Sequence, residues 1–296
     1  MSGRPGLLRR LGSAWVGRAA RPEPSALAAV VVLTPAVVVT GASEGIGRAL
    51  AHRFARRAEA LVLVARRQDA LDAVARDIAA NRPGLRIVTV AVNLTSETAA
   101  DVIAARVAEH GLYVDELVNN AGVGLGGPFV EQTAEDVARL VALNVAALTR
   151  LMSHFLPDML RRGRGGILNI SSLGGYAPGP FQAAYYASKA YVQSLTRAVA
   201  YEARGRGVRI AVAHPGPVET GFHARMKAEG AFYRRLLPSP SAETVARSIV
   251  RGYDAGLGSI HPGPLTSAAA VAMTLVPGVI MVPIIGWLLW PRRFGR

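Results

Sequence analysis

A glycine-rich stretch at residues 40–47 reads Thr40-Gly41-Ala42-Ser43-Glu44-Gly45-Ile46-Gly47. It follows a short β-branched run, Val37–Thr40, and precedes a segment with helical spacing, Arg48–Arg57. Glycine permits a tight turn and lets a ligand approach the main chain closely. The start of the following helix would present unpaired N–H groups and the positive end of its dipole. The stretch therefore predicts a turn that binds a pyrophosphate, with a ligand-free glycine loop as the alternative.

On either side of this turn, short apolar runs alternate with longer segments rich in alanine, leucine and arginine. The runs are Val37–Thr40, Leu61–Ala65, Ile87–Val92, Glu116–Val118, Gly166–Ile170 and Val208–Ala213. Strands separated by amphipathic helices form a parallel sheet covered on both faces, and right-handed crossovers make it doubly wound. We expect an α/β protein with one Rossmann-type, doubly wound parallel sheet in a single catalytic domain, residues 34–262. Residues 1–33 are predicted to be a basic flexible extension, and residues 263–296 a hydrophobic segment.

The composition excludes several classes of protein. The chain has 296 residues and no cysteine, so it has no disulfide framework, thiolate metal site or cysteine nucleophile. Its formal net charge is +14, and all of its 34 basic residues except Lys189 and Lys227 are arginine. The arginines are scattered rather than interleaved with aromatic residues, which argues against nucleic-acid binding and favours attraction to an anionic membrane surface. The six histidines lack metal-ligand spacing, so no metal site is expected.

The region before the first strand has two apolar features. Residues 1–25 are rich in arginine and glycine, with leucines and a tryptophan at helical spacing. They are interpreted as a disordered leader, with a helix lying on a membrane surface as the alternative. The apolar run at 26–39 is similar to the core of a signal peptide, but cleavage after it would remove the first strand. This run is also too short to span a membrane as an anchor.

The C-terminal segment carries no charge between Pro262 and Trp290. Its densest part, residues 271–290, exceeds the length of a membrane-spanning helix. Prolines and glycines at 277, 278, 283 and 286 interrupt it, which favours a kinked, interfacial or hairpin-like element. We expect contact with a membrane surface through residues 264–296, and a location on the cytoplasmic face of that membrane. The alternative is a soluble cytoplasmic protein that uses this segment as a lid or as the interface of a homo-oligomer.

Further polar motifs follow the later strands. In chain order they are Asn119-Asn120-Ala121-Gly122, Asn144 within Leu143-Asn144-Val145, Ile170-Ser171-Ser172, Tyr185-x-x-x-Lys189, and Pro215-Gly216 with Thr220. Tyr185 and Lys189 are four residues apart and therefore share one helix face.

Together with the G-x-x-x-G-x-G spacing of the first turn, these motifs resemble those of the short-chain dehydrogenase/reductase family over about residues 36–262. The regions Leu143–Leu151 and Ser241–Gly263 further resemble a DltE-like subgroup related to steroid and long-chain ketoacyl reductases. The resemblance implies a bound nicotinamide dinucleotide. It assigns cofactor contacts to Gly41, Ser43, Glu44, Gly45, Ile46, Gly47, Arg66, Asn93, Leu94, Asn120, Ala121, Gly122, Tyr185, Lys189, Pro215, Gly216, Val218 and Thr220.

The end of the second strand predicts which dinucleotide is bound. Enzymes that take NAD usually place an acidic residue there to hold the ribose 2′-OH. This strand instead ends in Arg66-Arg67, and the first acid is Asp69. Because guanidinium groups suit a 2′-phosphate, we expect NADP(H), with Arg66 a better candidate than Arg67. Asn93-Leu94 departs from the family's Asp-Leu, but the Asn93 amide can still pair with an adenine edge.

The resemblance also assigns the catalytic residues Asn144, Ser172, Tyr185 and Lys189. Tyr185 is expected to exchange a proton with the substrate oxygen, its pKa lowered by the Lys189 ammonium and a positively charged nicotinamide. Ser172 would hydrogen-bond that oxygen, and Lys189 the nicotinamide ribose. Asn144 would hold a water that links Lys189 to solvent, whereas the alternative is an exposed asparagine.

Tyr186 and Ser171 each lie directly beside one of these catalytic candidates. Tyr186 also shares a helix face with Lys189, but the family's interval from Ser172 selects Tyr185 as the catalytic tyrosine. Ser171 is expected to be a buried hydroxyl at the end of its strand. The family's glycine three residues after Asn144 is replaced by Ala147.

The substrate is predicted from the apolar character of two segments. Gly221–Pro240, where this fold builds its substrate lid, contains Phe222, Met226, Phe232, Tyr233, Leu236 and Leu237. With the uncharged C-terminal segment, it indicates a lipophilic carbonyl compound: a long-chain ketone, a ketoacyl thioester or a sterol-like ketone. We expect carbonyl–alcohol interconversion by hydride transfer. The alternative is a catalytically silent, membrane-associated scaffold that binds a dinucleotide.

Overall fold

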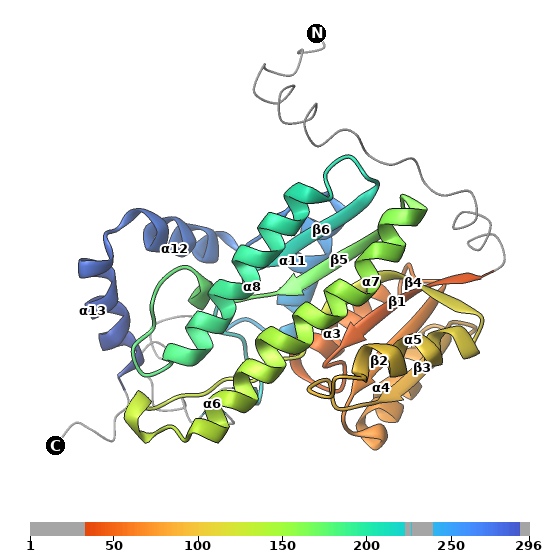
Figure 1. Cartoon of the computed structure of the whole chain (residues 1–296), viewed down its shortest axis with the longest axis horizontal. Coiled ribbons are helices and arrows are strands. Elements are labelled where there is room, and N and C mark those ends of the chain that lie inside the picture. Colours follow the sequence, from red (N-terminus) through yellow and green to blue (C-terminus); the bar gives the residue numbers. More distant parts are fainter. Residues whose placement is uncertain (1–32, 223–225, 227–238, 291–296) are drawn as a thin grey trace, which may run out of the picture.

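The computed structural model describes residues 33–222, 226 and 239–290, and the N-terminal extension lies outside these ranges. Within the described chain, seven parallel strands form one sheet in the order β3-β2-β1-β4-β5-β6-β7. Their bounds are β1 Thr34–Thr40, β2 Ala60–Ala65, β3 Arg86–Ala91, β4 Leu112–Asn119, β5 Gly165–Ile170, β6 Val208–Ala213 and β7 Ser259–Ile260. This doubly wound order confirms the predicted fold class (Figure 1).

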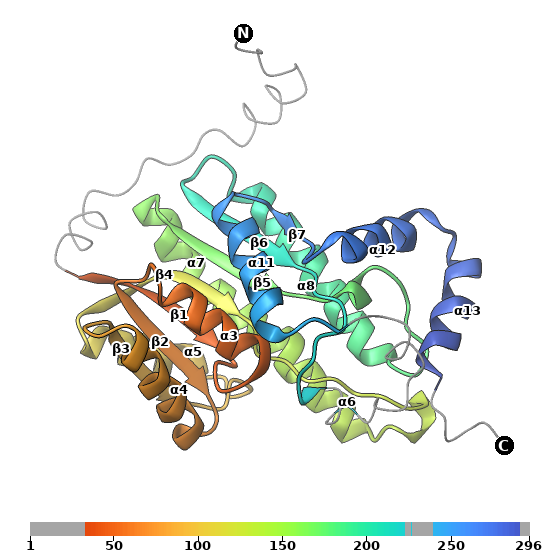
Figure 2. The same ribbon diagram turned by 180° about the vertical axis from the view of Figure 1, so that it is seen from behind.

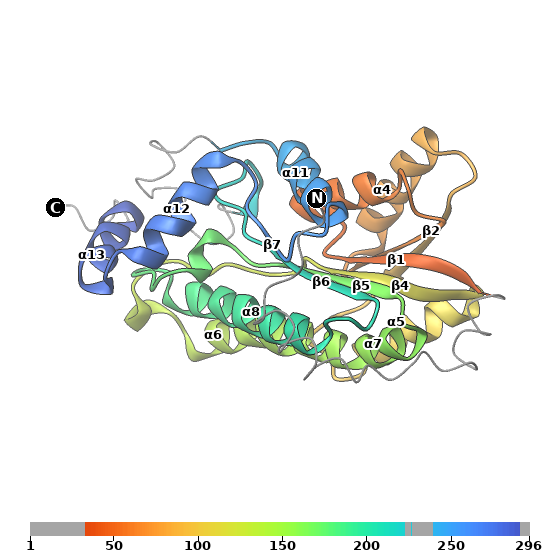
Figure 3. The same cartoon turned by 90° about the horizontal axis from the view of Figure 1, so that it is seen from above.

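The helices cover the sheet on both faces, because nearly continuous apolar strands must be shielded from water on each side. In Figure 3, α3, α4 and α11 lie on one face, and α5, α7 and α8 lie on the other. The main helices are α3 Gly45–Phe54, α4 Gln68–Asn81, α5 Ala99–Glu109, α6 Ala134–Val141, α7 Leu148–Arg162, α8 Ala183–Glu202 and α11 Ala242–Asp254.

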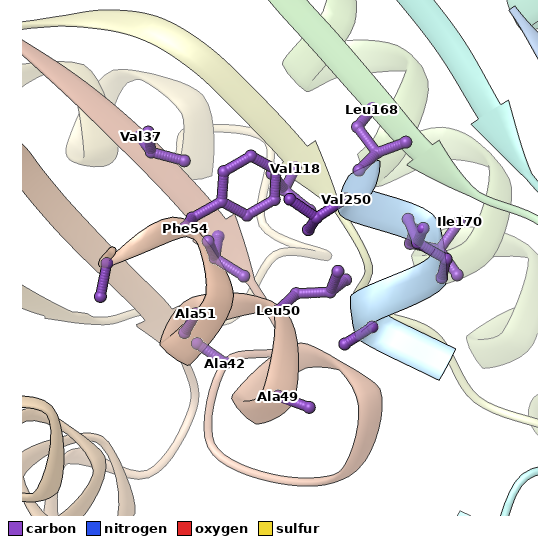
Figure 4. Close-up of a cluster of buried hydrophobic side chains, with 14 of the residues drawn as sticks. Val37, Ala42, Ala49, Leu50, Ala51, Phe54, Val118, Leu168, Ile170 and Val250 are labelled. Carbon is purple, nitrogen blue, oxygen red and sulfur yellow. The ribbon is translucent and has the colours of Figure 1, made fainter. Parts of the chain in front are cut away.

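A buried cluster fills the space between each helical layer and the sheet. In the cluster of Figure 4, Leu50 and Phe54 of α3 pack among Val37, Leu168 and Val250. Both α3 side chains are fully buried. The second cluster joins α5, α7 and α8 to the opposite face of the sheet. The two clusters hold the strand ends in fixed register, which positions the loops that follow them.

Several element bounds differ from the sequence prediction, and β1 begins at Thr34 rather than at Val37. β4 covers Leu112–Asn119 and is longer than the predicted 116–118. α3 begins at Gly45, so two of the turn's glycines, Gly45 and Gly47, belong to its first turn. β7 was not predicted, because a strand of 2 residues carries no readable alternation.

The C-terminal segment forms two helices, α12 Pro264–Leu275 and α13 Gly278–Leu289. Each has 12 residues, and the chain bends at Val276 and Pro277 between them, as Figure 2 shows. A helix of this length is about 18 Å long, whereas the hydrocarbon core of a bilayer is about 30 Å thick. Neither helix is therefore long enough to cross a bilayer alone.

One helical stretch of the described chain, Ala134–Arg162, has 29 residues and is long and apolar enough to cross a membrane by length and composition. Its second half is α7, whose Leu151, Phe155 and Met159 are buried in the second core cluster. This stretch is thus a helix of the folded core that packs on the sheet.

Candidate active site

The glycine turn between β1 and α3 has the backbone shape that its sequence predicts. Gly41 and Gly45 have φ of 65° and 55°, a region that disfavours other residues. A Cβ at Gly47 would lie 2.1 Å from the Gly41 carbonyl oxygen. Gly41 and Gly47 therefore have no room for a side chain, and Gly45 is restricted by its backbone conformation.

The end of β4 holds this turn in place. The Asn120 side-chain amide donates to the carbonyls of Thr40 and Gly41, at 3.1 and 3.4 Å. The Thr40 hydroxyl accepts from the backbone N–H groups of Asn120 and Ala121 and donates to the carbonyl of Val118. β1 and β4 are adjacent at the point where the strand order reverses, which is where open α/β sheets bind ligands.

The start of α3 fits a pyrophosphate. Glu44 is the N-cap residue, and no side chain caps the helix there, so the first N–H groups lack the partner that a serine or threonine cap would give. Ser43 and Ile46 are half-buried beside it. The glycine cradle and the uncapped helix start together have the shape and the free donors that a pyrophosphate requires.

β2 ends at Ala65, and the two exposed arginines Arg66 and Arg67 follow it directly. Arg67 is the N-cap of α4, and its Nη2 lies 3.7 Å from Glu44 Oε2. Arg66 forms no ion pair within the described part of the chain. The Asn93 side-chain oxygen accepts from the backbone N–H and the hydroxyl of Thr95, while Leu94 is buried. The side-chain oxygen of Asn93 is therefore already used within the local turn. The side-chain nitrogen of Asn93 is the group that suits an acceptor on adenine.

The two hydroxyls that were predicted to be catalytic, those of Ser172 and Tyr185, lie together at the end of β5. The side chains of Ser172 and Tyr185 lie next to each other, close enough for the serine to lower the pKa of the phenol. Ser172 Oγ also accepts from the Gly174 N–H at 3.1 Å, which caps the short helix η3, Leu173–Gly175. Tyr185 lies in the first turn of α8, so a helix and a strand end fix the two hydroxyls independently.

Lys189 lies one turn further along α8 and is 6% exposed. Its Nζ donates to the Ile170 carbonyl at 2.9 Å and lies 5.8 Å from the centre of the Tyr185 ring. The Ser171 hydroxyl is buried and donates to the Lys189 carbonyl, which agrees with the structural role expected for it. Because α8 and β5 are tied together twice, the ammonium has a fixed position beside the tyrosine.

Asn144 lies in a π-helical segment, Ala142–Ala147, between α6 and α7. Its side chain donates to the Val123 carbonyl and accepts from the Val123 N–H, at 2.8 and 2.9 Å. It also donates to Ser188 Oγ. Asn144 is 2% exposed, so it is a buried connector of β4, the π segment and α8. π segments occur often at functional sites, but a single asparagine in a helical pattern does not reveal one in advance.

Gly122 lies next to both the side-chain amide of Asn144 and the ammonium group of Lys189. A Cβ there would lie 3.2 Å from Asn144 Oδ1 and 3.5 Å from Lys189 Nζ.

The loop after β6 packs against the glycine turn and against Leu173. The Thr220 methyl group would contact a Cβ at Gly45 at 3.4 Å, and Val218 is buried. Pro215 accepts a backbone bond from Leu173, and a Cβ at Gly216 would meet Leu173 at 3.4 Å.

The surroundings of Tyr185 and Lys189 shift the pKa values of both side chains. Burial raises the pKa of the Tyr185 phenol, while the neighbouring Ser172 side chain opposes this rise. Burial lowers the pKa of Lys189 to about 8. The sequence-based expectation of a lowered tyrosine pKa is thus not met by the chain's own residues, because burial disfavours the phenolate more than its neighbours favour it.

Several residues that shape the site were not singled out from the sequence. The rings of His214 and His261 stack at 4.9 Å, and the hydroxyl of Tyr176 is 2.7 Å from His261 Nε2. Burial, and secondarily His261, lowers the pKa of His214 to about 3. The only sequence signal was the position of His214 directly before Pro215-Gly216, which does not indicate a partner 47 residues away.

Two apolar residues of the segment predicted to form the substrate lid, Phe222 and Met226, lie at the site. The Phe222 ring is 5.7 Å from the Tyr185 ring. Met226 is buried against Gly124, where a Cβ would approach it to 2.9 Å. The other predicted members of this segment, Phe232, Tyr233, Leu236 and Leu237, lie outside the described residues.

Comparison with known proteins agrees with this geometry. The family model described as short chain dehydrogenase matches residues 35–230. The very-long-chain 3-oxoacyl-CoA reductase of Bos taurus is 35% identical over 221 residues, which cover 72% of this chain and 67% of that protein.

Solved structures show the same fold with either cofactor. A short-chain dehydrogenase from Sphingobium yanoikuyae in complex with NADPH has a TM-score of 0.71 and 32% identity, over 82% of this chain and 96% of that one. A short-chain dehydrogenase/reductase from Burkholderia phymatum in complex with NAD has a TM-score of 0.72 and 27% identity, over 81% and 92%. The chain therefore belongs to the short-chain dehydrogenase/reductase family, whose members are oxidoreductases that bind a nicotinamide dinucleotide and act on carbonyl or alcohol groups.

Proposed function

We propose that this chain is an NADP(H)-dependent oxidoreductase that interconverts a lipophilic carbonyl compound and its alcohol. The observation that carries the proposal is the pairing of the Ser172 and Tyr185 side chains, with the Lys189 ammonium beside the tyrosine ring. Two hydroxyls held side by side can both bind one carbonyl oxygen, which is the arrangement that proton transfer to this oxygen requires.

The residues divide the work between them. A bound nicotinamide supplies the hydride in reduction and accepts it in oxidation. Tyr185 donates a proton to the carbonyl oxygen in reduction and takes it back in oxidation. Ser172 orients the oxygen and stabilises the negative charge that develops on it. Lys189 stabilises the phenolate electrostatically, and Asn144 positions Val123 and Ser188 and holds the water proposed for proton resupply.

Arg66 supports the choice of NADP(H). It is exposed at the end of β2, next to the β1–α3 turn that would hold the pyrophosphate. Glu44 is close enough to Arg67 to neutralise part of its charge, so Arg66 is the stronger candidate for the 2′-phosphate. Changing Arg66 to glutamine should raise the KM for NADPH about 10-fold, the loss of one charge-assisted bond, and leave that for NADH unchanged.

The substrate is proposed to be a long-chain ketone, a ketoacyl thioester or a sterol-like ketone. Phe222 gives the catalytic tyrosine an apolar neighbour, and Met226 of the same segment is buried against Gly124. The similarity to a 3-oxoacyl-CoA reductase supports the same class. We further propose that residues 264–296 contact the cytoplasmic face of a membrane, in a peripheral or monotopic manner. Membrane fractionation with and without these residues separates this proposal from a soluble homo-oligomer.

The function is tested by NADPH oxidation with a panel of ketones of increasing chain length. We expect kcat/KM to rise with chain length, because apolar surface is buried in the site. Turnover of short polar ketones far above that of any lipid would contradict the lipophilic substrate. A protein that binds NADPH but reduces none of the panel would be the catalytically silent scaffold instead.

A further inference from the structure

The helix α13 has two apolar faces of different exposure. Val279, Ile280, Ile284 and Trp287 are 82%, 53%, 46% and 59% exposed. At 100° per residue, these four lie within one half of the helix circumference, and we call them the outer stripe. A helix that is apolar on the side facing water needs a partner for that side.

The opposite side of α13 packs on the catalytic domain. Met281, Ile285 and Leu289, the inner stripe, are 8%, 3% and 6% exposed. They contact Tyr186 and Phe181 among their neighbours. The inner stripe therefore fixes α13 to the loop and the helix that carry the catalytic tyrosine.

The loop before α8 is held on this side by several close contacts. The Phe181 ring lies 5.2 Å from the Trp290 ring, and a Cβ at Gly286 would approach Pro180 to 3.3 Å. Phe181 has φ of 65°, an uncommon conformation for a bulky residue. Its carbonyl accepts from the Gly127 N–H at 2.8 Å. Contacts with the end of α13 and a hydrogen bond from Gly127 thus hold the strained loop that directly precedes α8.

Tyr186 is the link from this helix to the reacting groups. Its ring lies 6.1 Å from the ring of Tyr185. Gly174 and Gly179 face the same ring, and a Cβ would approach it to 3.2 and 2.4 Å. Gly174 donates to Ser172. One layer of side chains therefore separates the inner stripe from the hydroxyls that bind the substrate oxygen.

The chemistry around the outer stripe favours a lipid bilayer as its partner. No charged residue occurs between Pro262 and Trp290, and Arg292, Arg293 and Arg296 follow directly. The whole chain carries a net charge of +14, which favours anionic headgroups. A helix of 12 residues is too short to span, so it would lie in the plane of the interface with its apolar side inward.

A second exposed apolar element lies on the same side. Phe129 and Val130 are 60% and 92% exposed, and they follow Gly127, which is bonded to the Phe181 loop. Gly127 and the end of α13 are linked through Phe181, whose ring packs against Trp290. Two further exposed apolar side chains thus follow shortly after a residue that is bonded to the loop packed against α13.

We infer that the outer stripe of α13 inserts into the interface of a lipid bilayer while the inner stripe packs behind Tyr186 at the edge of the substrate site, so that a lipophilic ketone reaches Ser172 and Tyr185 from the membrane. This inference rests on the proposed function, which it deepens by naming the surface through which the substrate enters. It makes membrane binding and turnover of a membrane-dissolved ketone depend on the same side chains.

The test uses the full-length protein with the double variant Ile280→Asp/Ile284→Asp. The matched control is Val102→Asp/Leu257→Asp, which changes two residues that are 43% and 52% exposed outside α13. Flotation with phosphatidylcholine/phosphatidylserine vesicles measures binding. NADPH oxidation is measured with a long-chain ketone dissolved in the vesicles and with cyclohexanone in water. Thermal unfolding checks that each variant is folded.

We expect the α13 variant to lose about 10-fold or more in vesicle partitioning, because two aliphatic side chains that would insert into the bilayer become charged. Its kcat/KM for the vesicle ketone should fall in parallel, while that for cyclohexanone stays within about twofold. The control should match the wild type in every measurement. Should the α13 variant leave the vesicles yet reduce the vesicle ketone at the wild-type rate, delivery from the membrane is wrong.

Two other outcomes also decide the inference. If the wild type does not float with vesicles and is a dimer that the α13 variant converts to a monomer, the partner of the outer stripe is a second copy of the chain. If the wild type floats but oxidises NADPH with neither ketone, the proposed function fails, and the inferred route for a substrate falls with it. Vesicle binding, turnover of the soluble ketone and oligomeric state thus report on separate parts of the argument.

Discussion

Lys189 is an ammonium group in a nearly dry environment. It is 6% exposed and bonded to one backbone carbonyl, and burial lowers its pKa to about 8 from 10.5. Arginine stays protonated under such conditions and is planar, whereas lysine offers a compact charge that can titrate. A chain that uses arginine at 32 of its 34 basic positions therefore keeps lysine where a buried point charge is required.

The shift at Lys189 makes stability depend on pH in a defined window. Between pH 8 and 10.5 the unfolded chain holds the proton on this lysine and the folded chain does not. The folded state is therefore favoured as pH rises through that window, and below it the difference is constant. Relative to Lys189→Met, we expect the wild type to gain about 3 kcal/mol in free energy of unfolding from pH 7.5 to 10.5. Urea denaturation of both proteins at several pH values measures this, and parallel curves would contradict the shift.

Tyr185 and Tyr186 provide a matched pair of substitutions at adjacent positions. Tyr185→Phe removes the proton donor while keeping the ring, so kcat should fall by about 10³-fold, with NADPH affinity retained. Tyr186→Phe keeps the ring that packs between the glycines and the inner stripe, and kcat should stay within about threefold. Steady-state kinetics and NADPH titration of both variants test the assignment, which the opposite pattern would reverse.

At the scale of elements, the β1–α3 turn depends on the absence of a side chain. In Gly47→Ala the new methyl group would lie 2.1 Å from the Gly41 carbonyl oxygen, so the turn must open. We expect a loss of about 1–3 kcal/mol in stability and a clear loss of NADPH affinity. Gly258→Ala is the control, because nothing lies within 4 Å of a Cβ there. Unchanged NADPH binding in Gly47→Ala would show that this turn does not hold the dinucleotide.

The elements that the sequence revealed are those with a local signal. β1, β2, β5 and β6 are apolar runs bounded by turns, and the glycine turn and the Tyr185–Lys189 pair have diagnostic spacing. The π segment around Asn144 and the strand β7 have none, because both depend on packing between distant parts of the chain. The Tyr176–His261 contact joins residues 85 positions apart and is likewise invisible to periodicity.

The titration of Tyr185 shows the same limit inside the site. A lysine one turn away suggests a lowered phenol pKa, and the sequence contains that spacing. Burial depends on the residues that cover the ring, and it raises the pKa. Which effect is larger is a property of the folded environment, so spacing alone predicts the partners of a group but not the sign of its shift.

At the scale of the whole molecule, the net charge of +14 and the exposed apolar helix α13 act on a membrane by different physical routes. Attraction to anionic headgroups is screened within about 10 Å at 0.1 M salt and about 3 Å at 1 M, whereas apolar insertion does not depend on screening. Binding to anionic vesicles should therefore weaken about 10-fold between 0.05 and 0.5 M NaCl and then level off.

The level that remains at high salt isolates the contribution of α13. It should equal the binding to uncharged phosphatidylcholine vesicles, and Ile280→Asp/Ile284→Asp should remove it while retaining a salt-sensitive part at low ionic strength. Flotation across a salt series for both proteins measures the two contributions. Binding that disappears completely in 0.5 M NaCl would mean that charge alone holds the protein at the surface, because an inserted apolar helix stays bound under conditions that screen every exposed arginine.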